Sequence, residues 1–496
     1  MNLVDNDLAS IQEVRTLLHA ATKAQQQFGR FSQEQVDSVC KAIADAGVAA
    51  SERLAKMAQK ETGFGIWQDK VIKNVFGSKT IYEKYRDLKT VGIVEEHPEL
   101  KTIDMAVPVG VIAGLIPSTN PTSSVFYKAL IAVKAGNAIV FSPHPNAKNC
   151  ILEAVKVVSD AATAAGAPEG LISGITRPTL EATDELMKHK ETKLILATGG
   201  GAMVHAAYSS GTPALGVGPG NGSAFIEKSA NVAQAVKRIM DSETFDNGTI
   251  CASEQSIIAE DANKVEVRAE LKKQGGYFLN PDEIAKLSKF ILRGDNTMNP
   301  QIVGKSVQQL ADLAGLNVPM EARVLIVEDQ PENVGPQDPF SREKLTPIVA
   351  YFEVADCAAA ADLTVKLLTN EGAGHTAILH SENQKVIRQY AAKVPASRIL
   401  INTPGTLGGI GASTNLNPAL TLGCGAVGGS ATSENVSPLN LLDVKHVATG
   451  VREIEEVKRE VAEVAPAGVT AAPSTTPVDQ KQLVDELVRQ VLAQIQ

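Results

Sequence analysis

The sequence has few cysteines, no excess of positive charge and no long apolar run. Its 5 cysteines among 496 residues form no CxxC pair, which argues against a disulfide framework and against a thiolate metal site. A formal net charge of −9 disfavours nucleic-acid binding, because that needs a basic surface. No apolar stretch approaches a membrane span in length, and Asp5 and Asp7 stand where a signal peptide would be apolar. We therefore expect a cytoplasmic protein without metal, nucleic-acid or membrane partners.

The chain does contain a repeated alternation of short apolar runs and helical segments. With 496 residues it exceeds a single core, so two or three domains are expected. Residues 8–62 have the apolar spacing of helices, and 91–94 and 102–107 resemble strands. Apolar runs then alternate with helical segments over 109–215, and again from Ser229. This alternation predicts an α/β fold whose parallel sheets are covered on both faces.

The last part of the chain has a different composition. Val451–Val464 is a charged helix candidate, and residues 465–478 are rich in Ala, Pro and Thr, which is typical of a flexible linker. Residues 479–496 place their apolar side chains on one stripe, as in an amphipathic helix. A helix of about 18 residues is marginal alone in water, so this stripe needs a partner surface.

Three glycine- or proline-rich loops each allow more than one interpretation. Thr198–Ala202 precedes a possible helix, so its glycines either expose amides to a pyrophosphate or form an ordinary turn. Asn120 lies between two prolines and either caps the helix that begins near Thr122 or directs its amide at a developing oxyanion. Gly423–Gly428 matches GxGxxG but opens no helix in a βαβ unit, so we interpret it as a structural loop.

Cys251 lies in the stretch FDNGTICASEQS, just after the turn Asn247–Thr249. A cysteine at such a place is either a nucleophile or one of the buried thiols that are common in protein cores. Taken alone, the stretch favours the buried thiol.

Taken together and in order, these stretches resemble the aldehyde dehydrogenase superfamily, and within it the branch that transfers an acyl group to coenzyme A. The resemblance covers roughly residues 8–450, and the cysteine stretch with its Asp-Asn-Gly lead is its most specific part. The stretches that carry it are Pro117–Pro121, Lys134–Val140, Thr198–Gly200, Gly216–Asn221, Phe245–Gln255, Glu343–Pro347, Gly374–Thr376 and Leu420–Gly429.

The resemblance implies a role for each matching residue. Cys251 would attack an aldehyde carbonyl, and Asn120 with the backbone N–H of Cys251 would form the oxyanion hole. Hydride transfer to NAD⁺ would leave a thioester on Cys251. Glu343 would contact the nicotinamide ribose. The residues implied to bind the cofactor are Ile116, Pro117, Ser142, Thr198, Gly199, Gly200, Met203, Val217, Gly218 and Glu343.

Two departures from the hydrolytic relatives favour the acylating branch. Gly216 stands where those relatives have the glutamate that activates water, and loss of a general base costs about 100- to 10,000-fold in rate. The thioester should then resist water and wait for the thiol of CoA. Ser142 and Pro145 stand where the relatives hold the adenosine ribose with Lys and Glu, which is compatible with NAD⁺ and CoA using one pocket in turn.

The resemblance also implies an aldehyde dehydrogenase-like fold in parts. These are a Rossmann-like cofactor domain over 1–228, an α/β catalytic domain over 229–417, and a return segment over 418–450. The return segment and the strands near 91–107 would form a β-strand oligomerisation arm, and homodimers or homotetramers are usual for the family. The charged helix and linker over 451–478 would lead to the amphipathic helix.

The helix over 479–496 resembles an encapsulation peptide, which would bind shell proteins of a bacterial microcompartment. The alternative is that it docks on its own enzyme or extends an oligomer contact. The sequence thus predicts an NAD-dependent, CoA-acylating dehydrogenase of propionaldehyde or acetaldehyde. A hydrolytic enzyme that releases free acid, disfavoured by Gly216, and a non-catalytic scaffold, disfavoured by the joint presence of Cys251, Asn120 and Glu343, remain as alternatives.

Overall fold

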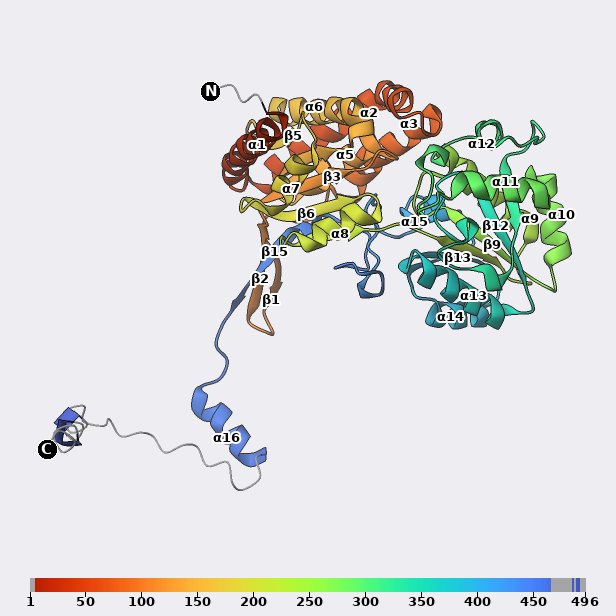
Figure 1. The fold of residues 1–496 in the computed structure, drawn as a ribbon. Coiled ribbons are helices and arrows are strands. Elements are labelled where there is room, and N and C mark those ends of the chain that lie inside the picture. The colour runs from red at the N-terminus through yellow and green to blue at the C-terminus, as the bar shows by residue number, and fades with distance from the viewer. Residues whose placement is uncertain (1–4, 465–483, 486–487, 491–496) are drawn as a thin grey trace. The chain divides into compact units, whose positions relative to one another are not determined.

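The computed structural model describes residues 5–464, 484–485 and 488–490, and the chain divides into two compact units (Figure 1). The first runs to Glu95 and continues over Asp104–Lys445, and the second comprises Glu96–Ile103 and the chain from His446. The predicted linker over 465–478 and most of the predicted helix over 479–496 lie outside the described residues. None of the described helices combines the length and the hydropathy that crossing a bilayer requires.

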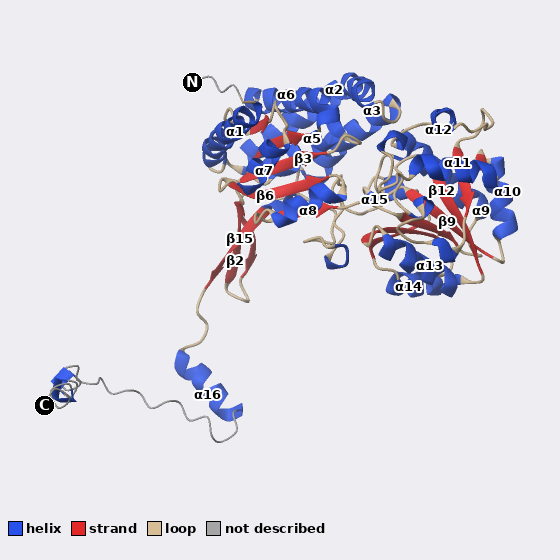
Figure 2. Ribbon diagram, in the orientation of Figure 1, coloured by secondary structure: helices blue, strands red, loops and turns tan. Residues whose placement is uncertain are grey.

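The first unit contains a five-stranded parallel sheet of order β5-β4-β3-β6-β7 (Figure 2). Its strands are β3 (Val111–Ile116), β4 (Ala138–Pro143), β5 (Ile172–Gly174), β6 (Thr192–Thr198) and β7 (Ala214–Val217). Every residue of β3 and β4 is buried, as expected for strands covered on both faces. The strand order reverses between β3 and β6, and ligands of open α/β sheets bind outside the carboxyl ends of strands at such a reversal.

Helices from two parts of the sequence cover this sheet. They are α1 (Asn6–Phe28), α2 (Gln33–Thr62), α3 (Trp67–Val75) and α4 (Ile81–Tyr85) before it, and α5 (Pro121–Lys134), α6 (Lys148–Ala164), α7 (Leu180–Lys188) and α8 (Gly201–Ser209) between its strands. α2 packs against α5 and α6, and α1 packs against α7. The core between them is apolar, with Val14, Leu54, Ile112, Phe126 and Ile139 fully buried. The helices predicted over residues 8–62 are therefore confirmed as α1 and α2.

A seven-stranded parallel sheet of order β10-β11-β12-β9-β8-β13-β14 follows in the first unit. Its strands are β8 (Gly222–Ile226), β9 (Glu254–Glu260), β10 (Gly276–Phe278), β11 (Val324–Glu328), β12 (Ile348–Val354), β13 (Gly374–His380) and β14 (Ala396–Ile401). The helices around it are α9 (Val232–Thr244), α10 (Lys264–Lys273), α11 (Pro281–Ile291), α12 (Val307–Ala314), α13 (Cys357–Asn370), α14 (Gln384–Lys393) and α15 (Gly405–Gly409).

The two large sheets meet in sequence at the loop Gly218–Asn221. β7 ends the first sheet at Val217, and β8 begins the second sheet at Gly222. The change from one sheet to the other therefore comes before the predicted domain boundary at residue 228. Residues 418–422, just before the GxGxxG match, form no strand, and Leu422 makes only an isolated bridge to Asn435.

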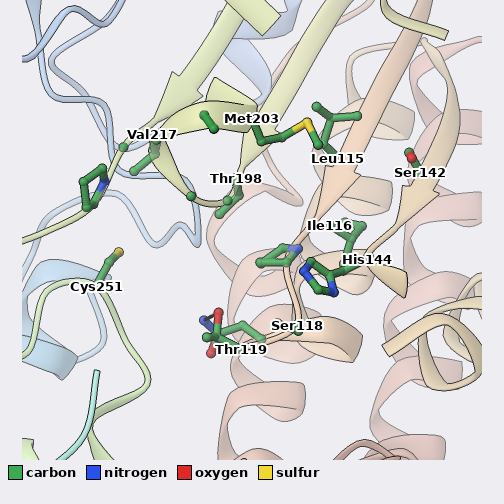
Figure 3. A pocket seen from close by; sticks show the side chains of 18 of the residues that line it. Leu115, Ile116, Ser118, Thr119, Ser142, His144, Thr198, Met203, Val217 and Cys251 are labelled. Atoms are coloured by element: carbon green, nitrogen blue, oxygen red, sulfur yellow. Dashed lines mark hydrogen bonds between the residues drawn. The ribbon is translucent and has the colours of Figure 1, made fainter. Parts of the chain in front are cut away.

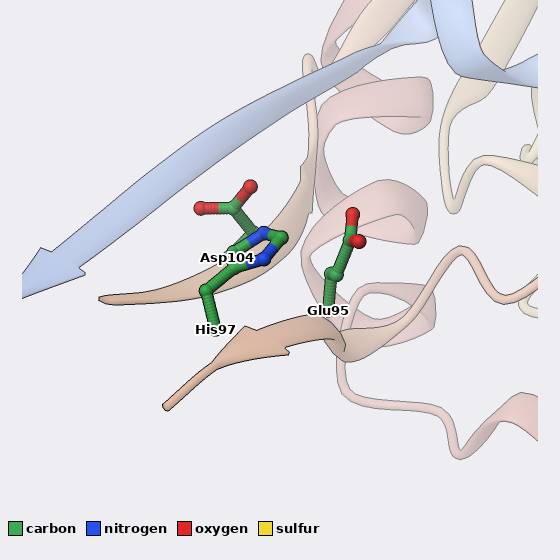
Figure 4. A group of neighbouring side chains, drawn as sticks. All are labelled: Glu95, His97 and Asp104. Atoms are coloured by element: carbon green, nitrogen blue, oxygen red, sulfur yellow. The ribbon is translucent and has the colours of Figure 1, made fainter. Parts of the chain in front are cut away.

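A three-stranded sheet of order β1-β2-β15 contains β1 (Gly92–His97), β2 (Thr102–Pro108) and β15 (Leu442–Ala448). The strands predicted near 91–107 are thus confirmed. Glu95 and His97 lie on β1, and Asp104 lies on β2 (Figure 4). Glu95 and Asp104 belong to the first unit and His97 to the second. α16 (Ile454–Val464), in the second unit, is the predicted charged helix.

Candidate active site

A cavity of about 600 Å³ lies at the carboxyl ends of β3, β4, β6 and β7, within the first unit (Figure 3). Figure 3 shows Cys251 at one end, and Ser142 and His144 toward the other. All the residues predicted to form the site line this cavity: Cys251, Asn120, Ile116, Pro117, Ser142, Thr198, Gly199, Gly200, Met203, Val217, Gly218 and Glu343. The structure therefore brings them together, and their individual roles remain predictions.

Cys251 follows a sharp turn of the backbone. Asp246, Asn247 and Gly248 all have positive φ, at 51°, 52° and 70°. The carbonyl oxygen of Cys251 is packed so closely on Gly220 that a Cβ there would lie 1.8 Å from it. The thiol is partly exposed, into the cavity, and burial together with the nearby Glu343 raises the pKa of Cys251 to about 12. At neutral pH it is therefore a thiol, which must lose its proton as it attacks.

Asn120 occupies the N-cap position of α5 but does not cap the helix with its side chain. Its Oδ1 accepts a hydrogen bond of 2.8 Å from Lys73 Nζ, and its Nδ2 donates at 3.3 Å to the carbonyl oxygen of Thr249. The capping interpretation is therefore wrong, because a buried cation competes successfully for the amide oxygen. The amide nitrogen is turned toward the loop that carries Cys251, as an oxyanion hole requires.

A buried ionic cluster supports this end of the cavity. Asp246 Oδ2 accepts from Lys70 Nζ at 2.9 Å and from Lys73 Nζ at 2.5 Å, and all three side chains are 3% exposed or less. Burial alone would raise the pKa of Asp246, but the two ammonium groups outweigh it and lower that pKa. Burial lowers the pKa of Lys73 to about 8, against the opposing effect of the Asp246 carboxylate. Neither lysine was identified from the sequence, since neither lies in a recognisable motif.

Toward the other end, the cavity is bordered by the glycine loop before α8. Gly200 is the N-cap of α8 and offers no side-chain cap, and the first N–H groups of a helix have no intrahelical partner. A Cβ at Gly200 would meet no atom within 4 Å, so there is space above it. Ser142 Oγ lies 2.9 Å from Thr183 Oγ1 at the end of β4. Helix N-termini of this kind bind anionic groups such as a pyrophosphate.

Glu343 is the one carboxylate among the described residues that line the cavity. Its Oε1 accepts a hydrogen bond of 2.7 Å from the backbone N–H of Gly220. Burial, with the charge of Glu371, raises the pKa of Glu343 to about 8. The carboxyl group is therefore protonated at neutral pH. The contact of Glu343 with the nicotinamide ribose stays a prediction. To make that contact, the carboxyl group would have to leave the N–H of Gly220.

Gly216 does not line the cavity, whereas its neighbour Val217 does. The backbone N–H of Gly216 donates to Tyr208 Oη at 2.9 Å, and a Cβ on Gly216 would lie 2.8 Å from the Tyr208 ring and from Val204. Alternate residues of a strand face opposite sides, so the side chain that faces the cavity at the end of β7 is that of Val217, which is apolar. The match of Gly216 to the water-activating glutamate of the hydrolytic relatives stays a prediction.

His375 lies behind Gly220, in the predicted motif Gly374–Thr376. Its Cε1 would be 3.4 Å from a Cβ on Gly220, and its Nδ1 lies 2.9 Å from Thr376 Oγ1. Its buried Nε2 has no hydrogen-bond partner among the described residues. Burial, together with Arg398, lowers the pKa of His375 to about 3, so the ring is neutral. The remaining lining residues are mostly apolar; Pro178, Leu180 and Ile410 lie outside every matched stretch, whereas Ile250, Leu420 and Leu422 lie within them.

Comparison with known proteins identifies the family. The model described as "Aldehyde dehydrogenase family" matches residues 3–311. The bifunctional aldehyde-alcohol dehydrogenase AdhE of Escherichia coli (strain K12) is 44% identical over 446 residues, which are 89% of this chain and 50% of that protein. The chain thus spans about half the length of that relative. The succinate-semialdehyde dehydrogenase (acetylating) of Clostridium kluyveri is 36% identical over 434 residues, 88% of this chain and 95% of that protein.

Solved structures agree with the fold. A probable aldehyde dehydrogenase from Listeria monocytogenes EGD-e is 61% identical, with a TM-score of 0.90 over 91% of this chain and 100% of that one. An acetylating aldehyde dehydrogenase from Geobacillus thermoglucosidasius is 50% identical, with a TM-score of 0.89 over 91% and 99%. A propionaldehyde dehydrogenase from the Clostridium phytofermentans fucose utilisation bacterial microcompartment is 26% identical, with a TM-score of 0.79 over 88% and 97%. The predicted aldehyde dehydrogenase-like fold is confirmed, and the chain belongs to the aldehyde dehydrogenase family.

Proposed function

We propose that this chain is an NAD-dependent aldehyde dehydrogenase that transfers the acyl group to CoA. The observation that carries the proposal is the environment of Cys251. The thiol shares one cavity with Asn120 and a helix N-terminus, while the residue facing the cavity from the end of β7 is Val217 and the lining carboxyl group, Glu343, is protonated at neutral pH. A nucleophile is thus present without an ionised carboxylate that would activate water. The relatives named acetylating support the same conclusion.

The glycine-lined part of the cavity fits the cofactor. The N–H groups at the start of α8 would hold the pyrophosphate of NAD⁺, with room left by Gly200 and Gly218. When bound, the nicotinamide supplies the acceptor for a hydride. Ser142 and Thr183, at the end of β4, would lie toward the adenosine.

Acylation of the enzyme uses the Cys251 end of the cavity. Sγ of Cys251 loses its proton and bonds to the aldehyde carbon, and the carbonyl electron pair moves to oxygen. Asn120 Nδ2 and the backbone N–H of Cys251 stabilise that oxyanion, for which Asn120 Nδ2 exchanges one of its 3.3 Å hydrogen bonds to Thr249 and Thr119. Loss of hydride from the same carbon then restores the C=O bond and leaves a thioester on Cys251.

Release of the acyl group reuses the same oxyanion site. The sulfur of CoA, having lost its proton, attacks the thioester carbon, and the bond to Cys251 Sγ breaks. The products are an acyl-CoA and the free Cys251 thiol, and the overall reaction yields one NADH and one proton per aldehyde. The apolar lining by Ile250, Ile410, Leu420 and Leu422 suits a short aliphatic aldehyde such as propionaldehyde or acetaldehyde.

The test measures NADH from propionaldehyde and NAD⁺ with and without CoA, and identifies the product by mass. We expect a burst of at most one NADH per chain without CoA, and steady turnover to propionyl-CoA with it. Equal steady rates under both conditions, with propionate as product, would establish the hydrolytic alternative. No NADH under either condition would establish the scaffold alternative, and full activity of a Cys251→Ala variant would remove the site.

The setting and the assembly of the enzyme form a second part of the proposal. A family member of 26% identity comes from a microcompartment, and residues 479–496 have the composition of an amphipathic helix. We propose that this segment binds shell proteins, and that the enzyme is a homodimer or homotetramer. A reporter fused to residues 465–496 should co-localise with coexpressed shell proteins, and a diffuse signal would refute the targeting. Light scattering of the full chain determines the oligomeric state.

A further inference from the structure

A lysine outside every motif contacts the oxyanion-hole residue. Lys73 lies on α3, its side chain is 2% exposed, and it reaches the loop of Asn120 and the loop of Thr249 together. α3 has no other direct link to the reaction in the mechanism above. A buried ammonium group is expensive unless every donor is satisfied, so its contacts at this place need an explanation.

The three protons of the Lys73 ammonium group match three acceptors. Nζ donates to Asn120 Oδ1 at 2.8 Å, to Thr249 Oγ1 at 2.9 Å and to Asp246 Oδ2 at 2.5 Å. An ammonium group has no acceptor, so it can bind only the oxygen of the Asn120 amide. The amide cannot rotate by half a turn without losing this bond. Nδ2 is therefore kept on the side of Thr249, two residues before Cys251.

The same contact also makes the amide a better donor. A cation bonded to the amide oxygen draws electron density from the nitrogen, so that the Nδ2 protons bind an oxyanion more strongly. The side chain of Lys73 is itself 2% exposed, and electrostatic interactions are stronger away from water. Lys73 thus acts on the reacting oxygen through Asn120 and touches no substrate itself.

Lys70 provides the matched control within the same cluster. It donates to the same Asp246 oxygen at 2.9 Å and is 3% exposed, but its further contact is with the carbonyl oxygen of Thr119 at 3.4 Å. Both lysines therefore have similar roles in the folding of the cluster, whereas only Lys73 bonds the Asn120 side chain.

We propose that Lys73 is a positioning residue that orients and polarises the Asn120 amide for oxyanion stabilisation. The inference rests on the proposed function and adds to it a residue from α3. It predicts that the contribution of Lys73 to acylation exists only while Asn120 is present.

A double-mutant cycle on the NADH burst tests the proposal. The variants are Lys73→Met, Asn120→Ala and the double variant, assayed with propionaldehyde and NAD⁺ without CoA. We expect the burst rate to fall about 100- to 1,000-fold for Asn120→Ala and about 10- to 100-fold for Lys73→Met, with KM for NAD⁺ unchanged within about threefold. In the double variant, loss of Lys73 should slow the burst by less than about threefold beyond Asn120→Ala alone, because the effects of coupled residues are not additive.

Two further variants separate positioning from folding. Lys70→Met should reduce the thermal midpoint as much as Lys73→Met, yet slow the burst less than about fivefold. Lys73→Gln keeps an N–H donor without the charge and should recover part of the rate that Lys73→Met loses. It replaces Lys73→Met in the cycle if that variant does not fold. Full additivity in the cycle, or an equal loss of rate for Lys70→Met and Lys73→Met, would overturn the proposal. Failure of the proposed function is distinct, since the wild-type chain would then show no CoA-dependent turnover.

Discussion

The proposed cofactor end of the cavity contains the glycine loop before α8, whereas the Cys251 end is formed by side chains held on a buried ionic cluster. At Gly200 a Cβ would meet no atom within 4 Å, so there is room there for a ligand. At Gly220 a Cβ would lie 1.8 Å from the Cys251 carbonyl oxygen, because the space is already filled by protein. The same residue type thus provides room for the ligand at one end and close packing at the other. We expect the reaction rate to depend on the filled end and the cofactor affinity on the open end.

The largest effect is expected for Gly220→Ala. The added methyl would have to displace the Cys251 backbone, since the clash is with a main-chain oxygen and the carbon beside it. A misplacement of about 1 Å costs on the order of 100-fold in rate, so the NADH burst should slow by about that factor or more. Stopped-flow absorbance at 340 nm measures it. An alanine variant with a wild-type burst rate would contradict the close packing.

Val217→Glu tests whether a carboxylate that faces the cavity from the end of β7 is enough to activate water. Figure 3 shows Val217 and Cys251 at the same end of the cavity. A carboxylate at residue 217 should activate water against the thioester, so the ratio of propionate to propionyl-CoA should rise about tenfold or more. Gly216→Glu is the matched control, because its side chain would run into Tyr208 and Val204 instead. Equal product ratios in the two variants would contradict the assignment of the faces.

Gly200→Ala should have a smaller effect that is confined to the cofactor. Gly200 has φ −62° and ψ 159°, which alanine also adopts, and nothing lies near the new methyl. The thermal midpoint should not change, whereas KM for NAD⁺ should rise about three- to tenfold because the pyrophosphate loses close approach to the N-terminus of α8. Parallel thermal melts and NAD⁺ titrations of Gly200→Ala and Gly220→Ala separate the two ends. If Gly200→Ala lost thermal stability while Gly220→Ala did not, the open end would be the closely packed one, contrary to the comparison above.

The open end was the more predictable part of the site from sequence. Apolar runs located the strands of the first sheet, and glycines after a strand identified the α8 loop, because both are local patterns. The filled end depends on contacts between distant segments. Lys73 and Asp246 are 173 positions apart, and no pattern around either predicts that they meet.

Two side chains show the limits of local reasoning about this site. Asn120 has the position of a helix cap, and only the approach of Lys73 shows that its amide is used elsewhere. At the end of β7 the side chain that faces the cavity is that of Val217, whereas the sequence argument about the missing base considered only its neighbour Gly216. Both cases concern where a side chain points, and that is fixed by packing.

Glu343→Gln gives the smallest and most specific effect, a change in pH dependence. The folded chain raises the pKa of Glu343 to about 8 from an ordinary value near 4.5, so the folded state binds more protons than the unfolded state between these values. The free energy of unfolding must then fall as pH rises through this window. From pH 5 to 9 the thermal midpoint of the wild-type chain should fall by about 1–3 °C more than that of Glu343→Gln, which keeps an acceptor for the Gly220 N–H. Because the Glu343 carboxylate also raises the pKa of Cys251, the variant should react with iodoacetamide at lower pH. Parallel midpoints of the two proteins from pH 5 to 9 would show that Glu343 is ionised at neutral pH, and the argument that no ionised carboxylate faces the thioester would then fail.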